Sequence, residues 1–204
     1  MQIVGMLDSP YVRRVAIAAQ CLSIDYEHRP LSIFHAYEEF RQLNPLVKVP
    51  TLICDDGEML VDSTLIVDYL QTIGKGGRNI YPSDETGRRK ALQLNGISLV
   101  AMEKLVQIIY ETRHRPEEYV HQPWIDRVMQ QLRSGLEMLE GYAGDGESWF
   151  FGDDITLADI SVAVAWSFCQ LTAKKRIAAT DFPGLSRFSE RAEALPEFIA
   201  CPIN

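Results

Sequence analysis

The dipeptide Ser9-Pro10 lies where a short apolar segment, residues 3–7, gives way to a predicted amphipathic helix over residues 10–22. Proline is well tolerated at the first position of a helix, and a serine just before it can cap a free backbone N–H group. The same N–H groups and the helix dipole also attract anions. Ser9 is therefore either a helix cap or a hydroxyl that donates a hydrogen bond to a bound anion.

The elements that would position Ser9 follow the order β-α-β-α-β-β-α. The pair Asp56-Gly57 lies between two apolar runs and predicts a hairpin. Apolar periodicity predicts the other elements: strands at residues 3–7 and 25–31, and helices at 10–22, around 37–43 and at 62–73. Together these elements predict a small α/β domain over residues 1–75.

The remainder of the chain is predicted to be all-helical. Residues 76–86 have the glycine-rich, polar composition of a linker, and residues 87–204 contain two long helical stripes. Thr156 and Asp159 form a capping-box pattern, flanked by Ile155 and Ile160 as a hydrophobic staple. The stripes are made of Leu94, Ile97, Ala101, Leu105 and Ile108, and of Trp124, Val128, Leu132, Leu136 and Leu139.

Composition excludes several classes of function. The formal net charge is −8, which disfavours a nucleic-acid partner. The four cysteines contain no CxxC pair and the four histidines no ligand-like spacing, so neither a metal site nor a dithiol centre is predicted. No apolar run approaches the roughly 20 residues of a membrane span, and no signal peptide is visible, so a cytoplasmic protein is expected. Most of the small basic clusters, of which Arg13-Arg14 is one, are expected to lie on a solvated face.

Three motifs, VPTL at residues 49–52, DST at 62–64 and ITLADISVA at 155–163, occur in an order that resembles cytosolic glutathione S-transferases. The resemblance covers nearly the whole chain. It implies a thioredoxin-like N-terminal domain, an all-helical C-terminal domain, glutathione as co-substrate, and a homodimer.

The resemblance also implies which residues bind glutathione. Val49-Pro50 matches a turn with a cis proline whose preceding residue pairs with the cysteinyl backbone of glutathione. Asp62-Ser63 matches the pair that holds the γ-glutamyl end, and Ser9 matches the active-site serine of serine-type members. Lys48 is a further expected contact. The family usually has glycine where Val47 stands, so the loop is expected to follow another path.

The size of the required pKa shift favours Ser9 as donor. A free thiol titrates near ~8.5, and making it mostly thiolate at neutral pH needs a shift of about 2 units, or about 2.7 kcal/mol. A hydrogen bond to a charged group contributes about 1.5–3 kcal/mol, and a helix N-terminus about 0.3–1 kcal/mol. Tyr11 is the rival donor. The segment DSPYVRR has no cysteine for glutathionyl exchange and lacks the serine-cysteine motif of the family's isomerases.

The second substrate is expected between the Ser9 loop and the long helix after the linker. Its candidate lining residues are Leu7, Tyr11, Met102, Tyr110 and Arg113. The predicted function is conjugation of glutathione to small electrophiles, a detoxification chemistry, or reduction of hydroperoxides. The alternative is a non-catalytic protein that uses this fold as a protein-interaction module.

Overall fold

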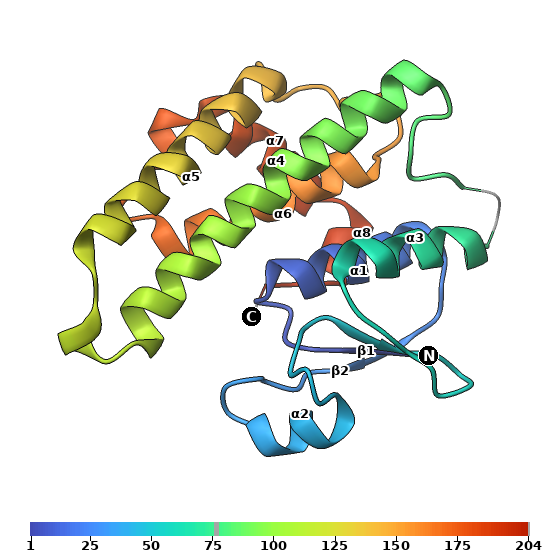
Figure 1. Cartoon of the computed structure of the whole chain (residues 1–204). Coiled ribbons are helices and arrows are strands. Elements are labelled where there is room, and N and C mark those ends of the chain that lie inside the picture. The colour runs from blue at the N-terminus through green and yellow to red at the C-terminus, as the bar shows by residue number, and fades with distance from the viewer. Residues whose placement is uncertain (76–77, 204) are drawn as a thin grey trace. The chain divides into compact units, whose positions relative to one another are not determined.

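The computed structural model describes residues 1–75 and 78–203, which form two compact units (Figure 1). The first unit combines Met1–Ile80 with Ala194–Asn204, and the second is Tyr81–Glu193. Residues 194–203 thus pack with the first unit, whereas the predicted C-terminal domain ran from residue 87 to residue 204. Residues 76–77 of the expected linker lie outside the described residues.

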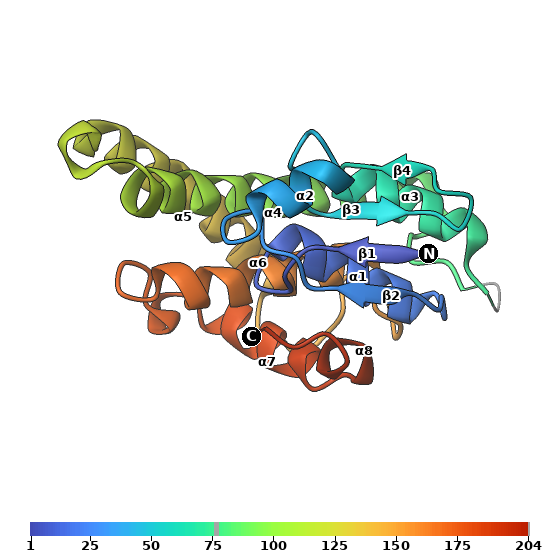
Figure 2. The same cartoon turned by 90° about the horizontal axis from the view of Figure 1, so that it is seen from below.

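The first unit contains a mixed four-stranded sheet in the order β2-β1-β3-β4 (Figure 2). Helices α1 and α3 lie together on one side of the sheet and α2 on the other (Figure 1). The chain order confirms the predicted β-α-β-α-β-β-α pattern. Its elements are β1 (Gln2–Val4), α1 (Pro10–Cys21), β2 (Glu27–Arg29), α2 (Tyr37–Leu43), β3 (Thr51–Ile53), β4 (Met59–Leu60), α3 (Ser63–Ile73) and α8 (Pro196–Ile199).

The strand register brings three connections to one edge of the sheet. β1 runs parallel to β2 and antiparallel to β3, with Val4 opposite Thr51. β3 runs antiparallel to β4, with Leu52 opposite Leu60. The chain therefore leaves β1, enters β3 and leaves β4 at the same edge. The predicted hairpin between β3 and β4 is present, with Gly57 at φ +88° donating its N–H to the Cys54 carbonyl at 3.0 Å.

The second unit is helical. Its central helix α4 packs against α5 and α6, and α7 packs against both of these. By length and composition alone, residues Glu85–His114 are apolar enough to cross a membrane, but in this structure they include the packed helix α4. The helices are α4 (Glu85–Ile109), a π-helical turn (Tyr110–His114), α5 (Gln122–Ala143), α6 (Leu157–Ala173) and α7 (Pro183–Glu193), with short 3-10 turns at Glu117–Tyr119 and Ala179–Asp181.

The capping box predicted for α6 is confirmed. Asp159 accepts hydrogen bonds from the Thr156 N–H at 2.7 Å and from the Thr156 hydroxyl at 2.6 Å. Ile155 and Ile160 are both buried, as a hydrophobic staple requires. Of the two predicted stripes, Trp124 departs from the pattern, because it is exposed at the start of α5 rather than buried.

Candidate functional site

The candidate site lies at the sheet edge where the three connections meet. Ser9 follows β1 and precedes α1, Val49-Pro50 precedes β3, and Asp62-Ser63 follows β4 and begins α3. Both α1 and α3 therefore have their N-termini at this edge. Free N–H groups and the positive ends of two helix dipoles make the edge attractive to anions.

Ser9 occupies the N-cap position of α1 but does not act as a cap. Its backbone is extended, and its side chain makes no capping hydrogen bond. The helix start is stabilised by Pro10 at the first position and by the Arg13 N–H, which donates to the Ser9 carbonyl at 3.0 Å. The half-buried hydroxyl is thus available to a ligand. The neighbouring Tyr11 ring lies 5.9 Å from the ammonium of Lys48, which brings Lys48 to the same part of the unit.

The loop before β3 differs from the expectation in one respect. Val47 has φ +47°, so the loop holds this residue in the left-handed region and does not take another path. A β-branched residue is unfavourable there. Buried Asn44 holds the turn by accepting the Leu46 N–H at 2.9 Å and donating to the Thr51 hydroxyl at 2.8 Å.

The same network fixes the segment that follows Val47. The Thr51 hydroxyl donates to the Lys48 carbonyl at 2.7 Å. The Val49–Pro50 peptide bond is cis, as the resemblance implies. Across the sheet edge, Gly5 at φ +137° leaves no room for a side chain, because an added Cβ would lie 3.0 Å from Val49 Cγ1 and 2.6 Å from Val12 Cγ2. In the described part of the chain, the main-chain N–H and C=O of Val49 form no hydrogen bond, so they are open to a peptide ligand.

Asp62 and Ser63 form the start of α3. Asp62 is the N-cap, and its Oδ1 accepts the Thr64 N–H at 2.8 Å. Its backbone combines φ +40° with ψ 146°, which lies outside the left-handed helical region that aspartate tolerates, so this residue is held in a strained conformation. Ser63 is 2% exposed and its Oγ accepts a hydrogen bond from Arg14 Nη1 at 3.0 Å. Asp62 thus has a structural role in addition to its predicted role in ligand binding.

The prediction that Arg13 and Arg14 are solvated is wrong. Both are buried, at 1% and 0% exposure, and Arg14 reaches the candidate site. A signal for this was present in the sequence: the helix carries apolar residues on nearly every side, and a helix that is apolar all round is buried. Arginines within such a helix must then be buried with it.

The residues predicted to bind an electrophile are distributed over both units. In the first unit, Leu7 is buried and Tyr11 half-buried. In the second, Met102 is fully buried, Tyr110 begins the π-helical turn with its ring 5.4 Å from that of His114, and Arg113 is exposed. Their common role at one pocket stays a prediction.

The cysteines do not join the site. Burial raises the pKa of Cys21 and of Cys169 to about 12 and also raises the pKa of Cys201, which keeps these thiols protonated. Cys54 is half-buried and lies just after β3. Among residues 1–75 and 78–203, no group of three His, Cys, Asp or Glu side chains is placed to hold a metal ion.

Comparison with known proteins identifies the family. Residues 3–76 match the glutathione S-transferase N-terminal domain and residues 122–191 the C-terminal domain. The chain is 30% identical over 203 residues to maleylacetoacetate isomerase of Pseudomonas aeruginosa, covering 91% of this chain and 87% of that protein.

Two solved structures are similar over almost the whole chain. A glutathione S-transferase of Methylobacterium radiotolerans in complex with glutathione sulfonate has a TM-score of 0.89 and 25% identity, covering 98% of this chain and 93% of that one. A glutathione transferase family member of Pseudomonas fluorescens with bound glutathione has a TM-score of 0.84 and 27% identity, covering 100% and 98%. The chain described here belongs to the glutathione S-transferase family.

Proposed function

We propose that the chain is a glutathione-dependent enzyme that uses the glutathione thiolate as its nucleophile. The observation that carries this proposal is the meeting of Ser9, Val49-Pro50 and Asp62-Ser63 at one edge of the sheet, beside the N-termini of α1 and α3. The structures of two similar proteins, one with glutathione sulfonate and one with glutathione, support it.

Each end of the tripeptide has a partner of suitable chemistry. The main-chain groups of Val49 pair with the cysteinyl backbone, as an added strand pairs with a sheet edge. Asp62 attracts the ammonium of the γ-glutamyl group, and Ser63 with the α3 amides binds its carboxylate. Lys48 offers its ammonium to a further carboxylate of the ligand.

The Ser9 hydroxyl donates a hydrogen bond to the thiolate and thereby lowers the thiol pKa. Its hydroxyl is not occupied by capping, and α1 adds the field of its N-terminus. The sulfur then forms a bond to an electrophilic carbon while the leaving group departs with its bonding electron pair. Alternatively, it attacks the terminal oxygen of a hydroperoxide: the O–O bond breaks, the alkoxide takes up a proton and leaves as an alcohol, and the glutathione sulfenic acid reacts with a second glutathione to give the disulfide and water. Leu7, Tyr11, Tyr110 and Arg113 are the proposed lining of the electrophile pocket, and Met102 is left out because it is fully buried.

A glutathione-dependent isomerase is the second candidate. It is favoured by the 30% identity to maleylacetoacetate isomerase of Pseudomonas aeruginosa over 91% of the chain. An isomerase returns the thiolate unchanged, whereas conjugation consumes it. Measuring loss of free thiol alongside conversion of maleylacetoacetate and of a chloronitrobenzene therefore separates the two activities.

Calorimetric titration with glutathione and with S-methylglutathione tests the proposal first. Binding of both ligands at a stoichiometry of one per chain is the expected result. Folded protein that binds neither would refute the enzymatic proposal and favour the non-catalytic interaction module.

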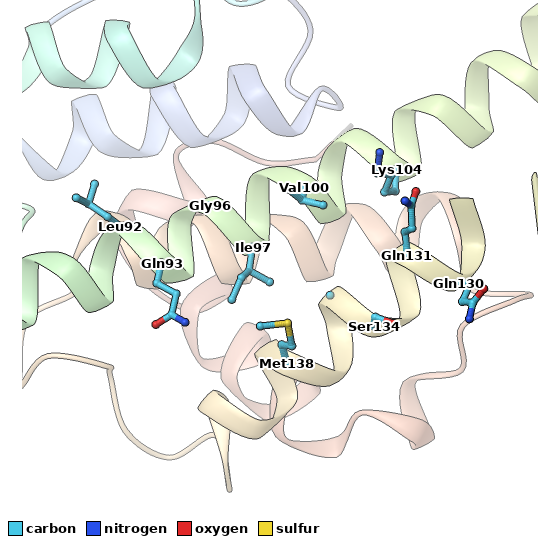
Figure 3. A pocket seen from close by; sticks show the side chains of 11 residues that line it. Leu92, Gln93, Gly96, Ile97, Val100, Lys104, Gln130, Gln131, Ser134 and Met138 are labelled. Atoms are coloured by element: carbon cyan, nitrogen blue, oxygen red, sulfur yellow. The ribbon is translucent and has the colours of Figure 1, made fainter. Parts of the chain in front are cut away.

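The second unit provides a surface for the proposed homodimer. A groove of about 670 Å³ lies between α4 and α5 (Figure 3). Its rim carries exposed Leu92, Val100 and Met138, and Gly96 and Gly135 allow a close approach. Exposed apolar side chains beside small residues are typical of interfaces between copies of a chain.

Substitution within the groove tests the dimer. A Cβ added to Gly96 meets nothing within 4 Å, so Gly96→Glu is tolerated by the folded chain. Light scattering should show a dimer for the wild-type protein and a monomer for Gly96→Glu. A wild-type monomer would refute the proposed assembly.

All four cysteines are free thiols, which supports the proposed cytoplasmic location.

A further inference from the structure

Two adjacent arginines of α1 are buried to the same degree but contact different elements. Arg13 donates through Nε to the Cys201 carbonyl at 2.8 Å, and its guanidinium lies 5.5 Å from the centre of the Phe198 ring. Arg14 reaches the start of α3, where Nη1 donates to Ser63 Oγ at 3.0 Å and to Thr64 Oγ1 at 3.3 Å. Arg14 therefore contacts the candidate site, whereas the Arg13 contacts described here are with Phe198 and Cys201.

The chemistry of the guanidinium determines what the Ser63 hydroxyl can do. A guanidinium has only donors, so Ser63 Oγ must be the acceptor in this bond. Each serine hydroxyl has one hydrogen, and that hydrogen is left to point away from Arg14. If a carbonyl or carboxylate stood in place of Arg14, the Ser63 hydroxyl would donate its hydrogen to that buried group and could not donate it to a ligand.

The position of Ser63 makes this orientation useful. Ser63 is the first residue of α3, where the helix leaves backbone N–H groups without intrahelical partners. The oriented hydroxyl, the amides and the buried cation behind them all favour a negative charge at the same point. Because Ser63 is only 2% exposed, little solvent separates Arg14 from that point.

We propose that Arg14 is a positioning residue for glutathione. It turns the Ser63 hydroxyl toward the α-carboxylate of the γ-glutamyl group and adds a positive field behind it. This inference rests on the proposed function. Arg14 has no role at the thiol, so it governs affinity for the carboxylate end and leaves the pKa of the bound thiol unchanged.

Arg14→Met removes the charge at nearly equal length and should weaken glutathione binding by about 10- to 100-fold, the range of a hydrogen bond to a charged group. Arg14→Lys keeps the charge without the planar fork and should lose about 3- to 10-fold, because a point charge restores only part of the interaction. Arg13→Met is the matched control. It should lower thermal stability through the segment around Cys201 and leave glutathione affinity unchanged.

A ligand without the carboxylate distinguishes positioning from general damage. The S-methyl form of 4-aminobutyryl-cysteinylglycine keeps the amine of the γ-glutamyl group but lacks its α-carboxylate. Wild-type protein should bind it more weakly than S-methylglutathione, and Arg14→Met should cause no further loss with it. A distorted site would weaken binding of both ligands by the same factor.

The outcomes separate this inference from the proposed function. Wild-type protein that binds no glutathione overturns both. Wild-type protein that binds glutathione, with unchanged affinity in Arg14→Met or an equal loss on both ligands, overturns the role of Arg14 alone. If circular dichroism shows that Arg14→Met is unfolded, Arg14→Lys with the same two ligands decides: a loss confined to S-methylglutathione supports the proposal, and an equal or absent loss refutes it.

Discussion

Replacing Ser9 by alanine should raise the pKa of the bound glutathione thiol by about 1–2 units and leave the stability of the fold unchanged. The expected rise in pKa follows from the free energy of a hydrogen bond to a charged group, about 1.5–3 kcal/mol, at about 1.36 kcal/mol per pKa unit. The unchanged stability follows from the structure, since the Ser9 side chain makes no capping hydrogen bond that alanine would remove. The α1 N-terminus is unaltered and retains its contribution of about 0.3–1 kcal/mol.

The thiol pKa can be measured in two ways. Ultraviolet absorbance of the thiolate, recorded while glutathione-saturated protein is titrated with base, gives the pKa directly. The pH dependence of conjugation gives it independently: activity rises with pH as the thiol ionises, so a higher pKa moves the rising limb to higher pH. At pH values below the pKa of both proteins, where the thiol is mostly protonated, a rise of one unit lowers the thiolate fraction by about 10-fold.

Thr156 is the control, because this residue does cap a helix. Thr156→Ala should lower the free energy of unfolding by about 1 kcal/mol or more and leave the thiol pKa unchanged. The reasoning is refuted if Ser9→Ala loses stability as Thr156→Ala does while the absorbance titration does not move. Ser9 would then be a cap and Tyr11 the next donor to test.

Three more predictions concern the site and its surroundings. Asp62→Asn keeps the α3 cap but removes the charge, so calorimetry should show about 10-fold weaker glutathione binding with little change in stability, whereas unchanged affinity would remove Asp62 from the site. The free energy of unfolding in urea should be higher for Val47→Gly than for Val47→Ala by about 0.5–1 kcal/mol. Glycine avoids most of the steric penalty of the left-handed backbone, although it loses more chain entropy on folding than alanine does. The reverse order of stability would contradict the positive φ at this position. Iodoacetamide should alkylate Cys54 in the native protein before buried Cys21, and early labelling of Cys21 would show that its environment opens.

Features encoded by neighbouring residues were predictable from the sequence. Pro10 marks the start of α1, Asp56-Gly57 marks the hairpin, and Thr156 with Asp159 marks the start of α6. Each depends on residues within a few positions of one another, so one sequence contains the whole signal. The family motifs extended this to the candidate site, because they added knowledge of where distant segments meet.

Features that depend on distant partners were not predictable. Arg14 and Ser63 are 49 positions apart, and nothing local to either residue indicates the hydrogen bond between them. The path at Val47 was predicted wrongly because residue preference was weighed without the Asn44 and Thr51 hydrogen bonds that hold the loop. Propensity describes one residue, whereas the observed backbone is set by the surrounding network.

The contact between Arg13 and Cys201 has a consequence for how the chain folds during synthesis. The first unit is built from two stretches of sequence, and residues 81–193 lie between them. Domains generally fold as they leave the ribosome, beginning with the N-terminal one. Here the ribosome has to translate the entire helical unit before the α1 arginine can meet its partner. The unit that begins first is therefore completed last, after the helices between its two stretches have had time to fold.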